Sequence, residues 1–301
     1  MKNKTLISIV GPTAIGKTAL SIELAKAYNC EIISADSRQF FKEMSIGTAK
    51  PTPEEMNGVV HHFVDCISIQ EFYTAGQFEN DVMTKLSEIF ENQDIAIMVG
   101  GSGLYVNAVL AGIDEIPSDL ELRNQLNQEL EEKGLRHMQQ KLKKLDYEHF
   151  KFMDKQNPQR LVRAIEVCLT TGKKYSELRN QTAKKREFDI IQVGITADRE
   201  VIYDRINQRV DSMVKDGLVE EVTGLFAQKE LNSLNTVGYK EIFRHLEGEW
   251  ELDFAIEKIK QNTRNFAKRQ LTWFKKDEKT TWFDIMNEKD KLVQHIEKSL
   301  K

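Results

Sequence analysis

Short apolar runs alternate with amphipathic segments along the first third of the chain. A short apolar run between polar or glycine-rich segments is typical of a buried strand, whereas apolar side chains at helical spacing are typical of a helix that faces a core. Repeated alternation of the two over residues 1–112 predicts a parallel β-sheet flanked by helices. The expected strands are residues 6–10, 31–35, 61–66 and 94–99, and the expected helices are 18–26, 74–92 and 104–110.

The pattern changes at Ile113. Charged segments with helical periodicity replace the strands as far as about Arg186, and a strand pattern returns at 188–195. We therefore expect an α/β core formed by residues 1–112 and 188–301, with an all-helical insertion at 113–187. The insertion is expected to hold helices 120–133, 136–145 and 158–169. The returning core is expected to hold helices 199–228 and 254–275, a strand at 282–284 and a helix after Glu288.

The composition is that of an ordinary globular protein, with 40% hydrophobic and 30% charged residues among 301. No apolar run reaches the roughly 18 residues of a membrane span, and residues 1–5 leave no room for a signal peptide, so neither is expected. Cys30, Cys66 and Cys168 are widely spaced, which favours reduced thiols in a cytoplasmic protein. Because the net charge is −4, any nucleic-acid binding must come from local basic patches.

A glycine-rich loop, GPTAIGKT, stands between the first strand and the following helix. It fits the pattern G-x-x-x-x-G-K-[ST] of phosphate-binding loops. In this strand–loop–helix context, backbone N–H groups can point at phosphate oxygens, Lys17 supplies a positive charge, and the Thr18 hydroxyl can bind Mg²⁺. The sequence therefore predicts an α/β fold of the P-loop NTPase type. The expected phosphate-binding residues are Gly11, Pro12, Thr13, Ala14, Ile15, Gly16, Lys17 and Thr18.

Asp36 follows the second expected strand, at the sheet edge where open α/β folds bind ligands. From the sequence alone, a turn or N-cap role for this aspartate is about as plausible as a functional one. In the functional interpretation Asp36 is a general base or a Mg²⁺ partner beside the phosphate site. The strand at 94–99 ends in Gly100 and Gly101, not in the aspartate that holds Mg²⁺ in NTP hydrolases, which weakens an NTP-hydrolase interpretation.

Basic residues gather in several segments. Arg205 and Arg209 lie four apart on one expected helix face and suit a diphosphate, although a solvated helix face is the commoner role of such residues. Residues 258–276 combine lysines and arginines with aromatic residues, which fits either a polyanion-binding surface or an aromatic core stripe beside exposed lysines. With a second basic group in the insertion, a nucleic-acid partner becomes plausible. His61 and His62 would point to opposite faces of a strand and so make a poor metal pair.

Further motifs, in order along the chain, make this sequence similar to the tRNA dimethylallyltransferase (tRNA isopentenyltransferase) family of bacterial type. The resemblance covers almost the whole chain. Two positions depart from the family pattern: Val60 stands in place of proline, and Ser102 replaces threonine but keeps the hydroxyl. The matching segments are GPTAIGKT (11–18), SADSRQ (34–39), GTAKP (47–51), HHFVD (61–65), GGSGLY (100–105), NPQRLVRAIE (157–166), VGYKE (237–241) and AKRQLTW (267–273).

The resemblance implies a reaction and roles for individual residues. The P-loop would hold the diphosphate of dimethylallyl diphosphate, with Thr13 bonded to the oxygen that bridges to the allylic carbon. Lys17 and Arg209 would neutralise the leaving diphosphate, together with a Mg²⁺ ion on Thr18. Asp36 would take a proton from the exocyclic N6 amine of the adenosine 3′-adjacent to the anticodon as that nitrogen attacks the allylic carbon.

The same resemblance implies that the insertion grips the anticodon stem-loop of tRNA and that the target base is flipped into the site. Nothing in the sequence suggests more than a monomer. The tRNA contacts that the family motifs imply are Asp36, Ser37, Arg38, Gln39, Ser102, Arg123, Gln159, Arg160, Leu161, Val162 and Arg163.

Three other functions compete with this interpretation. A P-loop kinase would explain the glycine-rich loop but not the order of the other motifs, and would turn over ATP without tRNA. An adenylate isopentenyltransferase would modify free adenine nucleotides and would not need the long basic insertion. A non-enzymatic RNA-binding protein would not need Asp36.

Overall fold

A computed structural model describes residues 4–114, 116–179 and 183–301. Residues 1–3, at the start of the chain where no signal peptide is expected, lie outside these ranges. Residues 115 and 180–182 of the expected insertion lie outside them as well. The chain divides into two compact units, one formed by residues up to 110 and from 185 onward, the other by residues 111–184. The sequence pattern had placed these two breaks after residues 112 and 187. None of the helices in the described ranges is long and apolar enough to cross a membrane.

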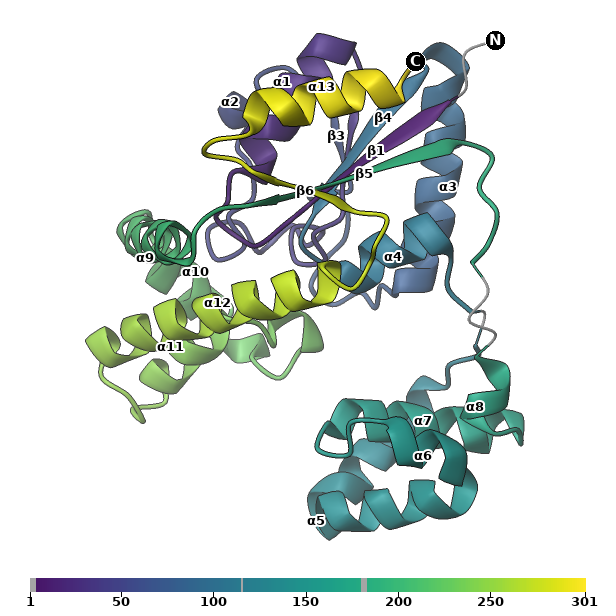
Figure 1. The fold of residues 1–301 in the computed structure, drawn as a ribbon. Coiled ribbons are helices and arrows are strands. Elements are labelled where there is room, and N and C mark those ends of the chain that lie inside the picture. Colours follow the sequence, from purple (N-terminus) through teal and green to yellow (C-terminus); the bar gives the residue numbers. More distant parts are fainter. Residues whose placement is uncertain (1–3, 115, 180–182) are drawn as a thin grey trace. The chain divides into compact units, whose positions relative to one another are not determined.

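The first unit is built on a parallel sheet, which confirms the predicted fold class (Figure 1). Within the described residues the strand order is β3-β2-β4-β1-β5-β6. The predicted strand at 61–66 is shorter than expected, because Phe63 (φ 62°) and Asp65 (φ 54°) adopt left-handed conformations that end it after His62. The strands are β1 (Thr5–Val10), β2 (Ile32–Ser34), β3 (His61–His62), β4 (Ile95–Gly100), β5 (Asp189–Thr196) and β6 (Thr281–Asp284).

Helices cover both faces of the sheet. Alternate strand residues point to opposite sides, so both faces carry apolar side chains that helices can bury. Ile7 and Ile9 of β1 pack on one side with α1 and α13, whereas Leu6 and Val10 pack on the other side with α3 and α4. The helices of this unit are α1 (Lys17–Tyr28), α2 (Pro53–Met56), α3 (Ala75–Asn92), α4 (Gly103–Ala111), α9 (Arg199–Lys215), α10 (Leu218–Gly224), α11 (Tyr239–Leu246), α12 (Leu252–Phe274) and α13 (Lys289–Ser299).

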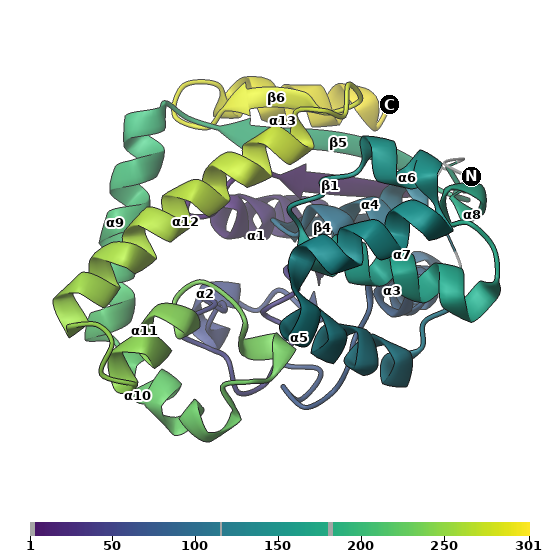
Figure 2. The same ribbon diagram turned by 90° about the horizontal axis from the view of Figure 1, so that it is seen from below.

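The predicted helix at 199–228 is wrong in its length. It stops at Lys215, and Gly217, at φ 104°, turns the chain before α10 begins at Leu218. Two short 3₁₀ helices follow at Phe226–Gln228 and Asn232–Leu234. The break lets α10 and α11 fold back beside α9 and α12, where they enclose a third apolar core (Figure 2).

The second unit contains helices and loops, with no strand among its described residues. Gly134 (φ 76°, ψ 171°) kinks α5 where the sequence predicted a break between two helices. Its helices are α5 (Leu120–Leu145), α6 (Tyr147–Phe152), α7 (Pro158–Thr171) and α8 (Tyr175–Leu178). Their apolar faces form a separate core of Leu126, Met138, Leu142, Leu161, Val162, Ala164 and Ile165.

Candidate active site

Two cavities open at the carboxyl edge of the sheet in the first unit. The phosphate-binding loop follows β1, Asp36 follows β2, and Gly101 follows β4, so parallel strand order brings the three segments together. One cavity, of about 970 Å³, is lined by the glycine-rich loop and is called here the phosphate-loop cavity. The other, of about 730 Å³, is called the aromatic cavity. The residues that line both are Thr13, Asp36, Thr48, Arg209, Met213, Phe266 and Gln270.

The phosphate-loop cavity is rich in positive charge. Lys17 Nζ donates to the carbonyl oxygens of Gly11 (3.0 Å) and Pro12 (2.7 Å), and Arg205 donates to the carbonyl of Ile15 (2.9 Å). Burial lowers the pKa of Lys17 to about 7, an effect that Asp36 opposes and Arg209 reinforces. Before a ligand binds, Lys17 is therefore only partly charged near neutral pH.

Arg209 is the second cation of this cavity. Burial lowers the pKa of its guanidinium, while the nearby carboxylate of Asp36 favours the charged form. Because an arginine stays protonated at any ordinary pH, Arg209 supplies a fixed positive charge where the two cavities meet.

Asp36 combines the two roles that the sequence left open. Its Oδ1 accepts the backbone N–H of Arg38 at 3.1 Å, which is a local turn contact. Within the described part of the chain, Oδ2 has no hydrogen-bond partner, and the residue lines both cavities. One carboxylate oxygen thus orients the side chain, and the other can accept a proton.

The aromatic cavity has aromatic and apolar residues among polar ones in its walls. Phe266 and Trp273 of α12 line it and remain 39% and 40% exposed, whereas Phe274 is buried in the core. The basic-aromatic helix predicted at 254–275 therefore uses its aromatic residues in both ways that the sequence allowed. A planar base can stack on exposed aromatic rings of this kind.

Gln270 of α12, which the sequence analysis did not single out, joins the loops of the site. Its side chain accepts from the N–H of Thr13 at 2.9 Å and donates to the carbonyl of Gly101 at 3.0 Å. Beside it, Ser102 Oγ accepts from the N–H of Ser37 at 2.9 Å. The position of Gln270 in the AKRQLTW motif was its only signal in the sequence.

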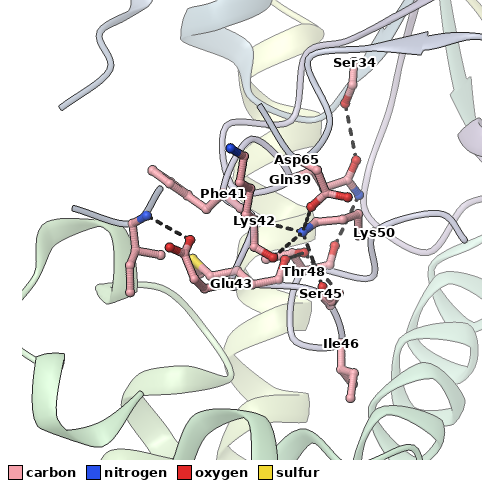
Figure 3. Close-up of polar contacts among 12 residues, drawn as sticks. Ser34, Gln39, Phe41, Lys42, Glu43, Ser45, Ile46, Thr48, Lys50 and Asp65 are labelled. Carbon is pink, nitrogen blue, oxygen red and sulfur yellow. Dashed lines mark hydrogen bonds and ion pairs between the residues drawn. The ribbon is translucent and has the colours of Figure 1, made fainter. Parts of the chain in front are cut away.

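The loop after Asp36 is closed by internal hydrogen bonds (Figure 3). Lys50 donates to the carbonyl of Phe41 at 2.8 Å and pairs with the carboxylate of Asp65. The Gln39 side chain accepts from Ser34 Oγ at 3.3 Å and donates to the carbonyl of Ala49 at 3.1 Å. The predicted tRNA contact of Gln39 would therefore compete with bonds that shape this loop.

Glu221 of α10 anchors the same loop from outside. Its carboxylate accepts the backbone N–H groups of Ser45, Ile46 and Gly47 at 3.0, 2.8 and 2.9 Å, and the hydroxyl of Tyr239 at 2.6 Å. Charged hydrogen bonds of this kind are roughly twice as strong as neutral ones. They fix the segment that carries Thr48 into both cavities.

Arg38, also predicted to contact tRNA, is bound to the protein itself. Its guanidinium donates to the carbonyls of Asn232 (3.2 Å), Ser233 (2.6 Å) and Asn235 (3.3 Å). Because Asn235 lines the aromatic cavity, this arginine supports the cavity wall.

The predicted tRNA contacts of the helical unit fall into two groups. Leu161 and Val162 are 0% and 3% exposed and their side chains fill the core of this unit, so their tRNA contacts stay predictions in which only the backbone could take part. Gln159 and Arg160, in the first turn of α7, are exposed.

Arg123 and Arg163 share a buried acceptor. Glu166 is 0% exposed and accepts from Arg123 at 2.8 and 3.0 Å and from Arg163 at 2.8 Å. Arg163 also donates to the carbonyls of Ile116 and Pro117 at 3.0 Å. Both arginines therefore stabilise the helical unit, and their tRNA contacts stay predictions.

The chain matches known proteins over nearly its full length. A family model described as IPP transferase matches residues 39–277. The tRNA dimethylallyltransferase of Christiangramia forsetii is 53% identical over 98% of each chain, and tRNA dimethylallyltransferase 1 of Bacteroides fragilis is 47% identical over 100% of each.

Solved structures agree in fold. The full-length tRNA isopentenylpyrophosphate transferase of Bacillus halodurans superposes with a TM-score of 0.72 at 37% identity, covering 99% of this chain and 97% of that one. A eukaryotic dimethylallyltransferase solved while acting on tRNA gives a TM-score of 0.77 at 26% identity, covering 97% of this chain and 77% of that one. The family model, the curated relatives and these structures together show that this chain belongs to the tRNA dimethylallyltransferase (IPP transferase) family.

Proposed function

We infer that this chain transfers a dimethylallyl group from dimethylallyl diphosphate to the exocyclic N6 amine of an adenosine in tRNA, and releases diphosphate. We place the adenosine 3′-adjacent to the anticodon. The observation that carries the proposal is the position of Asp36, which lines two adjoining cavities of different chemistry. A base at their boundary can take the proton of a nucleophile in one cavity while that nucleophile attacks an electrophile held in the other.

The two cavities suit the two substrates. The phosphate-loop cavity offers the N-terminus of α1, Lys17 and Arg209 to a diphosphate. The aromatic cavity offers apolar and aromatic walls to a flipped adenine. The allylic carbon and the amine would then meet beside Thr13 and Asp36.

The reaction is a substitution at the allylic carbon. The N6 nitrogen forms the new C–N bond while the bond from carbon to the bridging oxygen breaks, and its electron pair leaves with the diphosphate. Asp36 accepts the proton that the amine loses, a contribution of roughly 10²–10⁴-fold. Lys17 and Arg209 stabilise the growing negative charge of the diphosphate. The hydrogen bond from the Thr13 N–H to the Gln270 side chain keeps the phosphate-binding loop in place.

The residues at the site fit a Mg²⁺ ion. Among the described residues no group of three or more His, Cys, Asp or Glu could enclose a metal. Mg²⁺ commonly binds through one or two protein oxygens, substrate phosphates and several waters, so a closed cage is not needed. Thr18, exposed in the first turn of α1, lines this cavity and would hold the ion through its hydroxyl, and the ion would screen the charge of the diphosphate.

Two further expectations belong to this proposal. An enzyme that modifies tRNA would act in the cytoplasm. We also propose that the chain acts as a monomer.

The test is prenyl transfer by the purified chain with Mg²⁺, dimethylallyl diphosphate and either unmodified tRNA or AMP, followed by mass spectrometry of the adenine product. We expect transfer to tRNA and not to AMP. Asp36→Asn should lose most turnover yet keep tRNA affinity, while Asp253→Asn, at an exposed position of α12, should behave as the parent. Transfer to AMP alone would indicate an adenylate isopentenyltransferase, and ATP turnover without either transfer a kinase.

A further inference from the structure

Two apolar residues lie where the phosphate-loop cavity and the aromatic cavity adjoin. Among the described residues that line both cavities, Met213 and Phe266 are the ones whose side chains carry no oxygen or nitrogen. Phe266 is 39% exposed and Met213 is partly exposed, so both keep apolar surface that a ligand can cover. The proposed function uses the polar residues of this boundary, and it assigns no substrate group to Met213.

On α9, Met213 follows Arg209 by one turn. Residues four apart share one face of a helix, so the two side chains leave α9 on the same side. The carboxylate of Asp36 favours the charged form of Arg209, which places the guanidinium within electrostatic reach of the proposed base. The face of α9 that carries Met213 is therefore the face turned toward the reacting groups.

On α12, Phe266 precedes Gln270 by one turn and lies on the same helix face. The side chain of Gln270 accepts from the N–H of Thr13 at 2.9 Å, so this face of α12 contacts the phosphate-binding loop. The helices α9 and α12 also pack against each other. Each helix thus presents one polar and one apolar residue to the boundary of the two cavities.

The proposed reaction places an apolar group at this boundary. The allylic carbon lies between a diphosphate in one cavity and an amine whose proton Asp36 accepts, and Asp36 lines both cavities. Only a few bonds separate that carbon from the terminal methyl groups of a dimethylallyl chain, so the methyl groups stay near the boundary as well. Apolar side chains that cover them remove apolar surface of both partners from water.

We propose that Met213 and Phe266 bind the dimethylallyl group, and that Met213 sets a preference for a five-carbon chain. Met213 packs against the third apolar core, and Val210 and Leu218 of that core also line the aromatic cavity. A longer chain would have to displace the Met213 side chain against packed neighbours, which costs free energy. The proposal rests on the proposed function, because that function brings the prenyl diphosphate to this site.

Each of the two residues has a matched control on its own helix. Val214 packs against the same core as Met213, and Phe254 of α12 is 48% exposed. In the described part of the chain, neither of them lines either cavity. Val214→Ala and Phe254→Ala therefore report the loss of apolar side chains outside the site. Met213→Leu reports a change of shape with little change of volume.

The measurement is prenyl transfer to tRNA by the full chain, with either dimethylallyl diphosphate or the ten-carbon geranyl diphosphate as donor. We expect Met213→Ala and Phe266→Ala to lose about tenfold in kcat/KM for dimethylallyl diphosphate, because part of the apolar contact is gone. In Met213→Ala the ratio of geranyl to dimethylallyl transfer should rise about tenfold or more, since the shorter side chain leaves room beside Val210 and Leu218.

Met213→Leu and the two controls should stay within about threefold of the parent in both quantities. Inorganic diphosphate lacks the prenyl chain, so its Ki as an inhibitor should be the same for all variants. If Met213→Ala does not fold, Met213→Val takes its place in the same comparison.

Parent-like kcat/KM for dimethylallyl diphosphate in Met213→Ala or Phe266→Ala would overturn the binding role of that residue. Equal losses with both donors in Met213→Ala would overturn its role in chain length, and a raised Ki for inorganic diphosphate would assign the loss to the diphosphate site. Failure of the parent to transfer a dimethylallyl group would count against the proposed function. Normal transfer by the parent with unchanged selectivity in Met213→Ala counts only against the prenyl site.

Discussion

The side chain of Gln270 accepts a hydrogen bond from the backbone N–H of Thr13 at 2.9 Å. The two residues are 257 positions apart in the sequence, and the other end of the same amide donates to the Gly101 carbonyl. One buried side chain thus ties the phosphate-binding loop to the turn after β4. Its orientation is fixed, since reversing the amide would place donor against donor and acceptor against acceptor.

Gln270→Met should therefore weaken both folding and catalysis. Methionine has a similar shape but leaves the Thr13 N–H and the Gly101 carbonyl unpaired, which costs about 1–3 kcal/mol of unfolding free energy. We also expect kcat to fall more than tenfold, because the loop that carries Thr13 loses its support. Denaturant unfolding and prenyl-transfer kinetics check this, with the exposed Gln261→Met as control. Parent-like kcat in Gln270→Met would show that the loop holds its position without this bond.

Arg209→Ala should weaken handling of the diphosphate. Removing a charged hydrogen bond costs about 1.5–3 kcal/mol, or roughly 10–150-fold in affinity. Binding of dimethylallyl diphosphate by titration calorimetry measures the loss, and Lys215→Ala, exposed near the end of the same helix, is the control. A normal affinity in Arg209→Ala would remove this residue from the diphosphate site.

Diphosphate binding should weaken as the pH rises through 7. The pKa of Lys17 is about 7 in the free protein, so the ammonium loses its proton above that pH, while a bound diphosphate favours the charged form. Linkage then requires uptake of up to about one proton on binding near pH 8, and an affinity loss of up to about tenfold per pH unit.

Titration calorimetry in buffers of different ionisation enthalpy measures this uptake. Lys17→Arg keeps a fixed charge and corrects for protonation of the diphosphate itself. If the parent and Lys17→Arg take up the same number of protons, the titration of Lys17 is not linked to binding.

Glu221→Gln should loosen the loop between Ser45 and Lys50. Three backbone N–H groups lose a charged acceptor, and we expect the unfolding free energy to fall by about 2–4 kcal/mol. The KM for dimethylallyl diphosphate should rise, because the loop presents Thr48 to both cavities. The neighbouring Glu220→Gln, exposed in the first turn of α10, should leave both unchanged. A melting temperature equal to the parent's would contradict this anchoring role.

Glu166→Gln should destabilise the helical unit. Its carboxylate is buried between Arg123 and Arg163, which are partly exposed, so we expect a loss of about 2–3 kcal/mol, less than for a fully buried pair. Hydrogen exchange of the α5 and α7 amides in the full chain reports this loss, and the exposed Glu131→Gln is the control. Unchanged exchange in Glu166→Gln would contradict a stabilising role of these two ion pairs.

The sequence by itself determined the features that depend on neighbouring residues. Strand, glycine-rich loop and helix follow one another between Thr5 and Tyr28, and the change of periodicity at Ile113 marks the helical segment. Apolar periodicity and loop chemistry act within a few residues, so they can be recognised along the chain. The order of the motifs also pointed to the family before any contact was known.

Only the tertiary structure decided which side chains remain available for substrates. Arg38 and Gln39 look like free polar groups in the sequence, yet their hydrogen bonds go to Asn232–Asn235 and to Ala49. Gln270 looks like one more polar residue on a basic helix, yet it is buried against Thr13. Hydrogen-bond partners so far apart in the chain meet only when the sheet and its helices have packed, and no local pattern specifies that meeting.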